Sequence, residues 1–254
     1  MKLTYLILAL FLFSCKSQFP IAYNPLEAKN PKYDSYLKTK DGKILTGPSI
    51  SKENQNKIFK PTLFKIGDTT LKAKEVDEYQ DASGLYKRIA GQLTMAMTGP
   101  RIRVYRQLYE TTQTSYTGGF AHTSTSTSTV YYIQNAKEDK VYRVGLSSTK
   151  PMAEWTEDNA EANEQAILAR NMAGKIKLHR LISWGAILGG IVMISSDPAL
   201  KQKAGANASG GALLYTGSAF FFGGIVDLVI NVIHRRGKTG RAYAEAIRIY
   251  NSKK

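Results

Sequence analysis

Alternating apolar and polar residues over much of the first 150 positions predict β-strands, and this pattern changes near residue 150. Asp41-Gly42, a dipeptide typical of hairpin turns, separates two of the strand-like runs. Tyrosines are frequent here, which suits half-buried sheet faces because the ring packs while the hydroxyl stays in water. We therefore predict an antiparallel β-rich domain over residues 33–150. Its predicted strands include residues 36–39, 43–46, 101–109, 130–133 and 140–144.

Residues 123–129 read Thr-Ser-Thr-Ser-Thr-Ser-Thr and contain no large apolar side chain. Such a low-complexity stretch has no hydrophobic face from which its structure can be inferred. It predicts either a flexible loop or a solvated edge strand, and a plain exposed hairpin is favoured over a glycosylated segment.

From residue 151 the spacing of apolar residues becomes helical. Residues 156–159 are a helix start with acidic side chains in the first turn, and a charged helix is predicted from residue 161 to about residue 180. Residues 239–250 predict a short amphipathic helix near the C-terminus. The predicted class is therefore α+β, with an antiparallel β domain followed by a helical region over residues 151–254.

Two apolar segments lie within this helical region. Residues 181–196 span about 24 Å as a helix, which is short of a bilayer core of about 30 Å. Residues 210–233 span about 36 Å, but Asp227 and Asn231 interrupt them. A charged aspartate at a bilayer centre costs about 3 kcal/mol. The second segment is therefore long enough to cross a membrane and also carries a polar interruption.

The spacing of glycines predicts that these segments pack together as a helical hairpin over residues 181–233. Gly185 and Gly189 are four residues apart and predict a small-residue packing face on the first helix. On the second helix a glycine recurs every seven residues, and Asp227 and Asn231 continue that face. We expect the polar pair to lie in the interface and the chain to turn over residues 197–209. The glycines predicted on the second face are Gly210, Gly217 and Gly224.

Basic residues flank both outer ends of the predicted hairpin, and an antiparallel arrangement brings them together. They suit contact with anionic headgroups, at about 1 kcal/mol for each basic residue. Three alternatives stay open: the hairpin packs on its own soluble domain, it enters a membrane, or it mediates oligomerisation within a membrane. The predicted headgroup-contacting residues are Lys175, Lys177, His179, Arg180, His234, Arg235 and Arg236.

The N-terminus has the features of an export signal. Lys2 precedes an eleven-residue apolar run, 3–13, which is too short to span a bilayer. The run ends in Leu12-Phe13-Ser14-Cys15, which resembles the lipobox of bacterial lipoproteins, although Phe13 stands where that motif usually has a small residue. The resemblance implies cleavage before Cys15, a diacylglyceryl thioether on its sulfur, and acylation of the new amine by a palmitate-like chain.

The lipoprotein resemblance implies a location in the cell envelope. Residue 16 is lysine rather than the aspartate that retains such lipoproteins at an inner membrane, so the periplasmic face of the outer membrane is expected. Residues 1–14 are then the signal peptide and residues 15–32, with three prolines, an extended lipidated tether. A hairpin crossing the inner membrane from outside would put both basic clusters on the non-cytoplasmic side, against the positive-inside rule.

Composition narrows the chemistry. Apolar residues make up 43% and charged residues 22%, which excludes wholesale disorder, and the net charge is +15. One cysteine excludes an intramolecular disulfide, and the few histidines argue against a structural zinc site. None of the common catalytic motifs is present, so we expect no catalytic residue, no cofactor and no metal.

We therefore expect a non-enzymatic envelope lipoprotein that acts as a membrane-apposed adaptor or assembly component. Its expected partners are the membrane and other envelope proteins. A homo-oligomer is compatible with this role, and the expected location excludes nucleic acid as a partner. The alternatives are an enzyme that processes envelope lipid or glycan, and an oligomeric membrane-inserting ring subunit. A deep cleft converging on His122, Glu110 or Asp227 would favour the enzyme.

Overall fold

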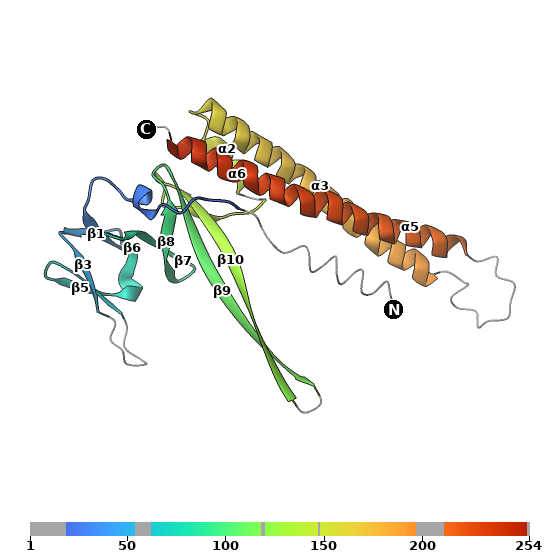
Figure 1. Ribbon diagram of the computed structural model, residues 1–254, viewed down its shortest axis with the longest axis horizontal. Helices are drawn as coiled ribbons and strands as arrows, with labels where there is room; N and C mark the ends of the chain where they lie inside the picture. Colours follow the sequence, from blue (N-terminus) through green and yellow to red (C-terminus); the bar gives the residue numbers. More distant parts are fainter. Residues whose placement is uncertain (1–18, 54–61, 118–119, 147, 197–210, 253–254) are drawn as a thin grey trace. The chain divides into compact units, whose positions relative to one another are not determined.

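A computed structural model describes residues 19–53, 62–117, 120–146, 148–196 and 211–252. Antiparallel sheets occupy the N-terminal part and helices follow them, which confirms the predicted α+β class (Figure 1). The chain divides into two compact units, and each is treated by itself below. We call Ile21–Ser148 together with Ile247–Ser252 the β unit, and Thr149–Ala246 together with Phe19 and Pro20 the helical unit.

This division differs from the predicted ranges at the C-terminus. The change from β to helical structure falls at Ser148, close to the expected position, but the last residues of the C-terminal helix group with the sheet. The physical reason is a set of side-chain bonds from Asn251 to the backbone of Arg101 and Ile102. Amphipathic spacing reveals that a helix has a buried face, but not which element covers that face.

The β unit contains an eight-stranded sheet with the order β11-β10-β9-β8-β7-β6-β1-β2 and a three-stranded sheet with the order β3-β4-β5. Neighbouring strands among the described residues pair antiparallel. Two short 3-10 helices accompany the sheets. The elements are η1 (Pro25–Ala28), β1 (Ser35–Thr39), β2 (Ile44–Gly47), β3 (Ile50–Glu53), β4 (Leu63–Ile66), β5 (Thr69–Lys72), η2 (Ala73–Glu75), β6 (Val76–Asp81), β7 (Gly84–Ile89), β8 (Gln92–Thr98), β9 (Ile102–Thr117), β10 (Phe120–Asn135) and β11 (Val141–Arg143).

Local turn chemistry fixes the register of the sheet. Strands β1 and β2 pair across the predicted Asp41-Gly42 turn, where Gly42 has a φ of 88° that favours glycine. Strands β7 and β8 are joined by Ala90-Gly91, and both residues have positive φ, as the two-residue turns of twisted hairpins require. The strands predicted at 130–133 and 140–144 are also present, within β10 and β11, and they pair with each other.

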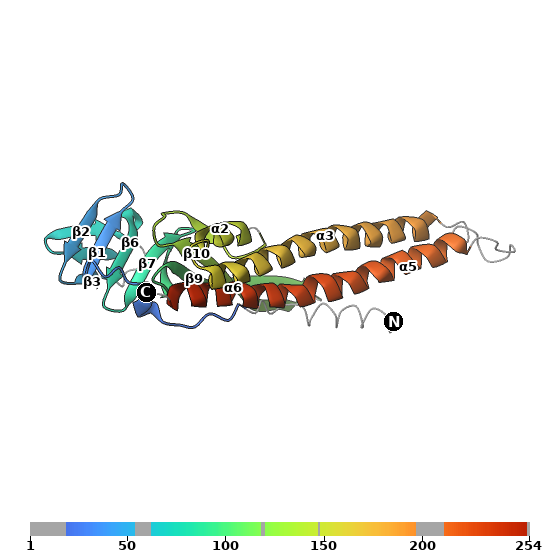
Figure 2. The same cartoon turned by 90° about the horizontal axis from the view of Figure 1, so that it is seen from above.

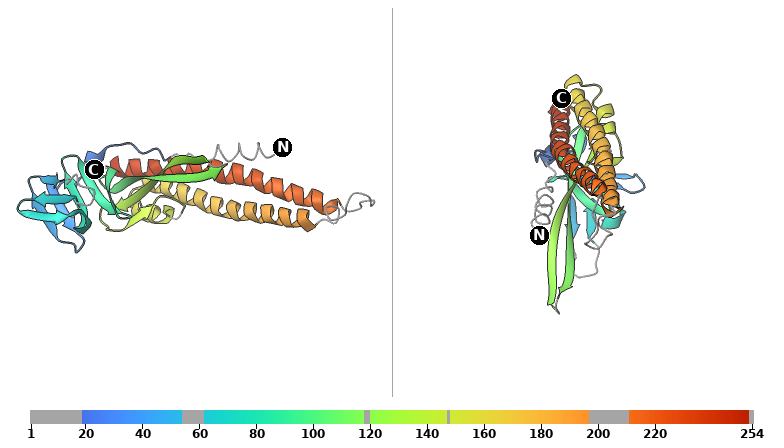
Figure 3. Two further views of the ribbon diagram at one scale, coloured as in Figure 1. Left: turned by 90° about the horizontal axis from the view of Figure 1, so that it is seen from below. Right: turned by 90° about the vertical axis from the view of Figure 1, so that its right-hand side faces the viewer.

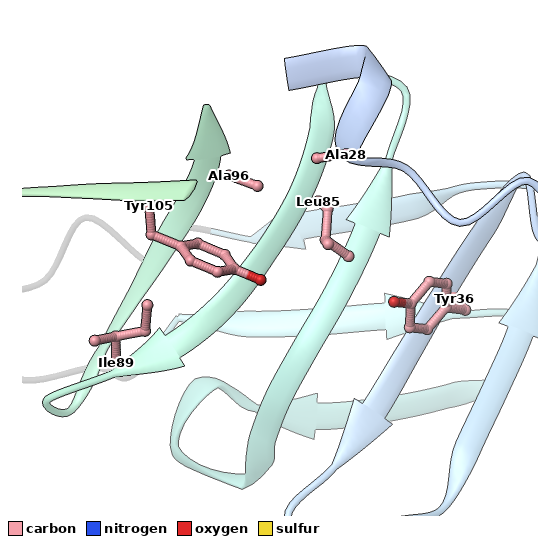
Figure 4. Close-up of a cluster of buried hydrophobic side chains, with 6 residues drawn as sticks. All are labelled: Ala28, Tyr36, Leu85, Ile89, Ala96 and Tyr105. Carbon is pink, nitrogen blue, oxygen red and sulfur yellow. The ribbon is translucent and has the colours of Figure 1, made fainter. Parts of the chain in front are cut away.

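The large sheet has a hydrophobic cluster on each face. On one face Leu37, Val76 and Tyr79 pack with Phe64 and Ile66 of the three-stranded sheet. On the other face lies a second cluster, in which the hydroxyls of Tyr36 and Tyr105 point toward one another from opposite parts of the sheet (Figure 4). The six buried residues of this second cluster are Ala28, Tyr36, Leu85, Ile89, Ala96 and Tyr105.

Part of the segment predicted as an extended tether is packed on the sheet instead. Ala28 of η1 is fully buried, and the backbone N–H of Asn24 donates to the carbonyl of Met97. Gly99 makes this contact possible, because a Cβ there would lie 2.5 Å from the Cα of Ala28. Prolines in this segment interrupt periodicity, but they do not prevent the chain from docking in a 3-10 turn.

Strands β9 and β10 form a ribbon that extends well beyond the rest of the sheet (Figures 1 and 3). The two strands pair over sixteen registers, from Ile102↔Asn135 to Thr117↔Phe120. The Ser/Thr repeat lies within β10, so of the two interpretations the exposed strand is the one observed. Cross-strand pairs such as Thr112–Thr125, with hydroxyl oxygens 3.3 Å apart, accompany the backbone ladder there.

The helical unit contains α2 (Thr149–Trp155), α3 (Ala160–Ser196), α5 (Ala212–Asp227), the π-helical η3 (Leu228–His234) and most of α6 (Arg235–Ser252). Helix α3 is 37 residues long, and it joins the predicted charged helix and the first apolar segment in one continuous element. Elements α5, η3 and α6 likewise form one run, so the predicted short helix at 239–250 is the end of a much longer one. Helices α3 and α5 lie side by side (Figure 2).

Candidate functional site

The candidate functional site is the pair of apolar helices. Contacts run in opposite directions along them, from Gly190 against Gly217 to Ser183 against Gly224, so the predicted antiparallel hairpin is confirmed. The buried residues of α3 recur at steps of four and three, the spacing of helices that pack along a shallow left-handed seam. Most are small, which allows close approach. They are Ala162, Ala166, Ala169, Ala173, Ile176, Ser183, Ile187 and Gly190.

Close backbone approach in the hairpin depends on three glycines. A Cβ on Gly190 would lie 2.5 Å from the carbonyl oxygen of Gly217, and one on Gly217 would lie 2.8 Å from that of Gly190. A Cβ on Gly224 would lie 2.8 Å from the carbonyl oxygen of Ser183. The predicted interface positions of Gly217 and Gly224 therefore agree with the structure.

The prediction for Gly185 and Gly189 is wrong. A Cβ built on either residue meets no atom within 4 Å among the described residues, so neither one lies in the contact with α5. The interface instead uses Gly190, one residue further along the helix. Two residues four positions apart lie on the same face of a helix, but their spacing does not show which neighbour that face contacts. Because apolar residues surround this helix on several sides, spacing alone could not identify the face that contacts α5.

A polar cluster closes the hairpin at its basic end. The Nδ1 atom of His179 lies 3.0 Å from Asp227 Oδ1, and the hydroxyl oxygen of Ser183 lies 2.7 Å from Asp227 Oδ2. Asn231 donates to the same carboxylate through its side-chain amide. Asp227 and Asn231 therefore do face the partner helix, as expected. Sequence reasoning missed Ser183, although its place in the four-and-three repeat of small residues was a usable signal.

His179 corrects a second prediction. We expected it to contact headgroups at the membrane interface, but its ring pairs with Asp227 across the two helices. The π-helical turn begins directly after Asp227, and such turns are frequent at functional positions. The cluster thus provides hydrogen bonds for a carboxylate that would otherwise be costly in an apolar setting.

The other predicted basic residues are mostly exposed. Lys175, Lys177 and Arg180 lie on the surface of α3 before its apolar part. His234 and Arg236 are exposed on the second helix, whereas Arg235 is half-buried and its Nη1 has no hydrogen-bond partner among the described residues. Both clusters lie at the same end of the hairpin, because its helices are antiparallel.

Large apolar side chains cover the outside of the hairpin. Leu181 is 74% exposed and Val192 is 62% exposed, and both project from α3 away from its buried residues. Only 17% of the most apolar stretch of α3 and 11% of that of the second helix is buried. Exposed large apolar residues of the pair include Ile182, Trp184, Leu188, Ile191, Leu213, Tyr215, Phe220, Phe222, Val226 and Ile230.

Both helices are long enough and apolar enough to cross a membrane. Residues 181–196 alone are too short to span a bilayer. They belong to a longer continuous helix, however, and the stretch that could span extends further toward the N-terminus of α3. A helix pair with such a surface is atypical of a soluble domain, in which contiguous exposed apolar patches are small.

The remaining predicted positions lie either outside the described residues or away from the helical hairpin. Cys15, Gly210 and the expected turn at 197–209 lie outside the described residues. His122 and Glu110 both lie on the exposed ribbon of β9 and β10, at registers five pairs apart, and neither lines the cavity beside Thr39 and Leu71 or the one beside Tyr36 and Glu78. Across the described residues, no three His, Cys, Asp or Glu side chains gather closely enough to hold a metal ion.

Comparisons with known proteins add no relatives: no family model, no curated protein and no solved structure matches this chain.

Proposed function

We propose that the chain is a non-enzymatic envelope lipoprotein in which acylated Cys15 and the helical hairpin hold the β unit at a membrane surface. The observation that supports this proposal best is the apolar outer surface of α3 and α5. Lipid tails are the apolar phase that could cover such a surface on every side. The β unit then serves as the part that binds another envelope protein.

The energetic terms favour insertion in spite of the polar cluster. A charged aspartate in a bilayer centre costs about 3 kcal/mol, and Asp227 is already hydrogen-bonded by three side chains. Full burial of one large apolar side chain contributes about 1.5–3 kcal/mol. Leu188 and Ile191, each about half exposed, therefore offset most of that cost by themselves.

The basic residues support a placement relative to the headgroups. Lys175, Lys177 and Arg180 share one end of the hairpin with His234 and Arg236, so all five would meet the same leaflet. Each of the lysines and arginines among them adds about 1 kcal/mol beside anionic lipid. We propose that this leaflet is the periplasmic one of the outer membrane. The positive-inside rule, which keeps basic loops in the cytoplasm, does not determine orientation in that membrane.

If the lipid on Cys15 and the helical hairpin both anchor the protein, removing them one after the other should release it from the membrane only at the second step. Cys15→Ala should abolish metabolic labelling with a clickable fatty acid, yet the protein should stay in the carbonate-washed membrane because the hairpin holds it. Adding Leu188→Glu and Ile191→Glu should then release it, since two charges oppose insertion. Ser17→Ala is the matched control and should retain both label and anchoring.

Two results would contradict the proposal. Fatty-acid labelling that persists in Cys15→Ala would refute the lipid anchor. Complete release of Cys15→Ala into the soluble fraction, with its hairpin unchanged, would refute the inserted hairpin and favour packing of the helices on a soluble domain.

A further inference from the structure

The ribbon of β9 and β10 leaves the outer edge of β10 open over most of its length (Figure 3). Strand β11 pairs with residues 132–134 of β10, and the N–H of Val144 donates to the Tyr131 carbonyl at 2.8 Å. From Phe120 to Val130, no strand among the described residues pairs with this edge. Residues 120–129 are all exposed. The backbone along this stretch is therefore available to another strand.

Alternation in the ladder shows which residues direct their backbone groups to that edge. In an antiparallel pair, successive residues point their N–H and C=O groups to opposite sides of the strand. The Tyr131 carbonyl points outward to Val144, and the pairing of β10 with β9 runs without a register shift. The outward groups therefore belong to the odd-numbered residues Ala121, Thr123, Thr125, Thr127 and Thr129.

This edge lacks the features that normally keep strands of different molecules apart. Folded proteins protect exposed edges with charged side chains, prolines or bulges. No Lys, Arg, Asp, Glu or Pro occurs from residue 111 to residue 129, although charged residues make up 22% of the chain. The β9 strand differs, because it carries exposed Arg106 and Glu110. Of the two edges of the ribbon, that of β10 therefore opposes a further strand less.

The sequence of the β10 edge is complementary to itself. Residues 123–127 read Thr-Ser-Thr-Ser-Thr, which is symmetric about Thr125, and Thr125 is also the midpoint of the open stretch from Phe120 to Val130. A second β10 that runs antiparallel with the two Thr125 residues opposed therefore places threonine opposite threonine and serine opposite serine. Cross-strand threonine pairs are favourable.

The same register gives an exposed aromatic ring an apolar neighbour. Phe120 is 73% exposed near the tip of the ribbon. With the two Thr125 residues opposed, Phe120 of each copy lies opposite Val130 of the other. An uncharged edge has no means to select a partner of opposite charge, whereas its symmetry matches an identical strand. These features favour a second copy of this chain over an unrelated protein.

We propose that the β10 edges of two copies pair antiparallel about Thr125 and join the two ribbons into one four-stranded sheet. The outward-pointing residues of the two edges then exchange about ten backbone hydrogen bonds. Because the contact is two-fold symmetric and occupies the β10 edge of both chains, it closes as a dimer. Threonine pairs like Thr114–Thr123, with hydroxyl oxygens 3.4 Å apart, already occur within the ribbon. The inference concerns the β unit alone and does not depend on the proposed membrane function.

A charge on the two-fold axis tests the pairing. Thr125→Lys puts two like charges directly opposite each other, and we expect it to raise the dimer Kd at least about tenfold. Thr112→Lys is the matched control and should leave the Kd unchanged, because exposed Thr112 lies opposite Thr125 but on β9. Both variants remove the Thr112–Thr125 hydroxyl pair, so the loss of that contact affects them equally. Sedimentation of the full-length chain in detergent micelles measures the Kd.

Crosslinking tests the register in full-length protein that also carries Cys15→Ser. Residues 125 of the two copies would have Cα atoms about 5.5 Å apart, whereas residues 112 would be three strand spacings, about 14 Å, apart. With a short bismaleimide, Thr125→Cys should therefore form dimers at least about tenfold faster than Thr112→Cys.

Three results would overturn this pairing. The first is sedimentation as a monomer at every concentration up to roughly 0.1 mM, which would exclude a second copy as the occupant at any Kd below that value. The second is an equal dimer Kd for Thr125→Lys and Thr112→Lys, which would place the contact elsewhere, on the helical hairpin or the β9 edge. The third is crosslinking through residue 112 that is as fast as through residue 125.

Discussion

Asn251 shows how one side chain joins the end of a helix to a strand about 150 positions earlier. Its Oδ1 accepts from the backbone N–H groups of Arg101 and Ile102, at 3.1 and 2.8 Å, and its Nδ2 donates to the Ile102 carbonyl at 2.9 Å. Ile102 is fully buried at the start of β9. Arg101 also lies over the ring of Tyr250, 4.5 Å from its centroid. The final turn of α6 is therefore part of the β unit.

Replacing this residue tests that assignment. Asn251→Ala should destabilise the β unit by about 1–3 kcal/mol, because it leaves buried backbone groups of β9 without partners. Amide hydrogen exchange should accelerate at Arg101 and Ile102 in particular. Ser252→Ala, which removes only a bond to the carbonyl of Ile249 in the same helix, is the control and should change exchange at neither amide. Unchanged protection in Asn251→Ala would mean that the helix end does not support β9.

Residue-level roles were the hardest to predict from the sequence. Gly217 and Gly224 were placed correctly, because Asp227 and Asn231 share their face and polar groups in apolar helices turn toward partners. Gly185 and Gly189 were misplaced, because the step of four between them fits more than one face of α3 and Ser183, which marks the face that contacts Asp227, was overlooked. The buried Arg103, whose Nε has no hydrogen-bond partner among the described residues, could not be predicted, because its surroundings come from strands far apart in the sequence, such as β6 with Glu78.

At the scale of elements, the adjacent glycines of α3 provide a matched pair. Gly190→Leu should destabilise the hairpin by about 1–3 kcal/mol or more, since its side chain would collide with the backbone of α5 at Gly217 and Phe221. Gly189→Leu should be tolerated, because open space surrounds a Cβ at that position. Thermal unfolding of the detergent-solubilised protein, followed by circular dichroism at the helix band, measures the difference. Equal unfolding midpoints for the two variants would contradict this helix contact.

The elements themselves were largely predictable where periodicity and turn chemistry agreed. The Asp41-Gly42 hairpin and the pairing of β10 with β11 follow from alternation and polar turns. The boundaries of the long helices did not follow, because α3 changes from charged to apolar composition without interrupting its backbone hydrogen bonds. The Ser/Thr ribbon stayed ambiguous for the opposite reason: β10 has no apolar face there, and only its pairing with β9 defines it as a strand.

At the scale of the whole molecule, the proposed membrane function allows two orientations, which differ in the side of the membrane on which the β unit and the basic clusters lie. An antiparallel hairpin returns the chain to the side from which it came. A lipid on Cys15 implies that this side is periplasmic, whereas the basic clusters of an ordinary inner-membrane hairpin would place it in the cytoplasm. The two alternatives predict opposite accessibility for the same residues, so they can be separated without knowledge of the partner.

If Cys15 is acylated as proposed, the chain has no free thiol, and single cysteines can be introduced into the otherwise unaltered chain. Thr114→Cys on the exposed β ribbon and Arg236→Cys beside the hairpin should both react with a membrane-impermeant maleimide in cells whose outer membrane alone is permeabilised. They should react together, because residue 114 precedes the hairpin and residue 236 follows its apolar part, so both lie on the side from which the chain enters the membrane. The parent chain is the control and should not react. If residues 114 and 236 react only after the inner membrane is lysed, while Lys203→Cys between the two helices reacts before lysis, the basic clusters face the cytosol and the lipid anchor must be abandoned.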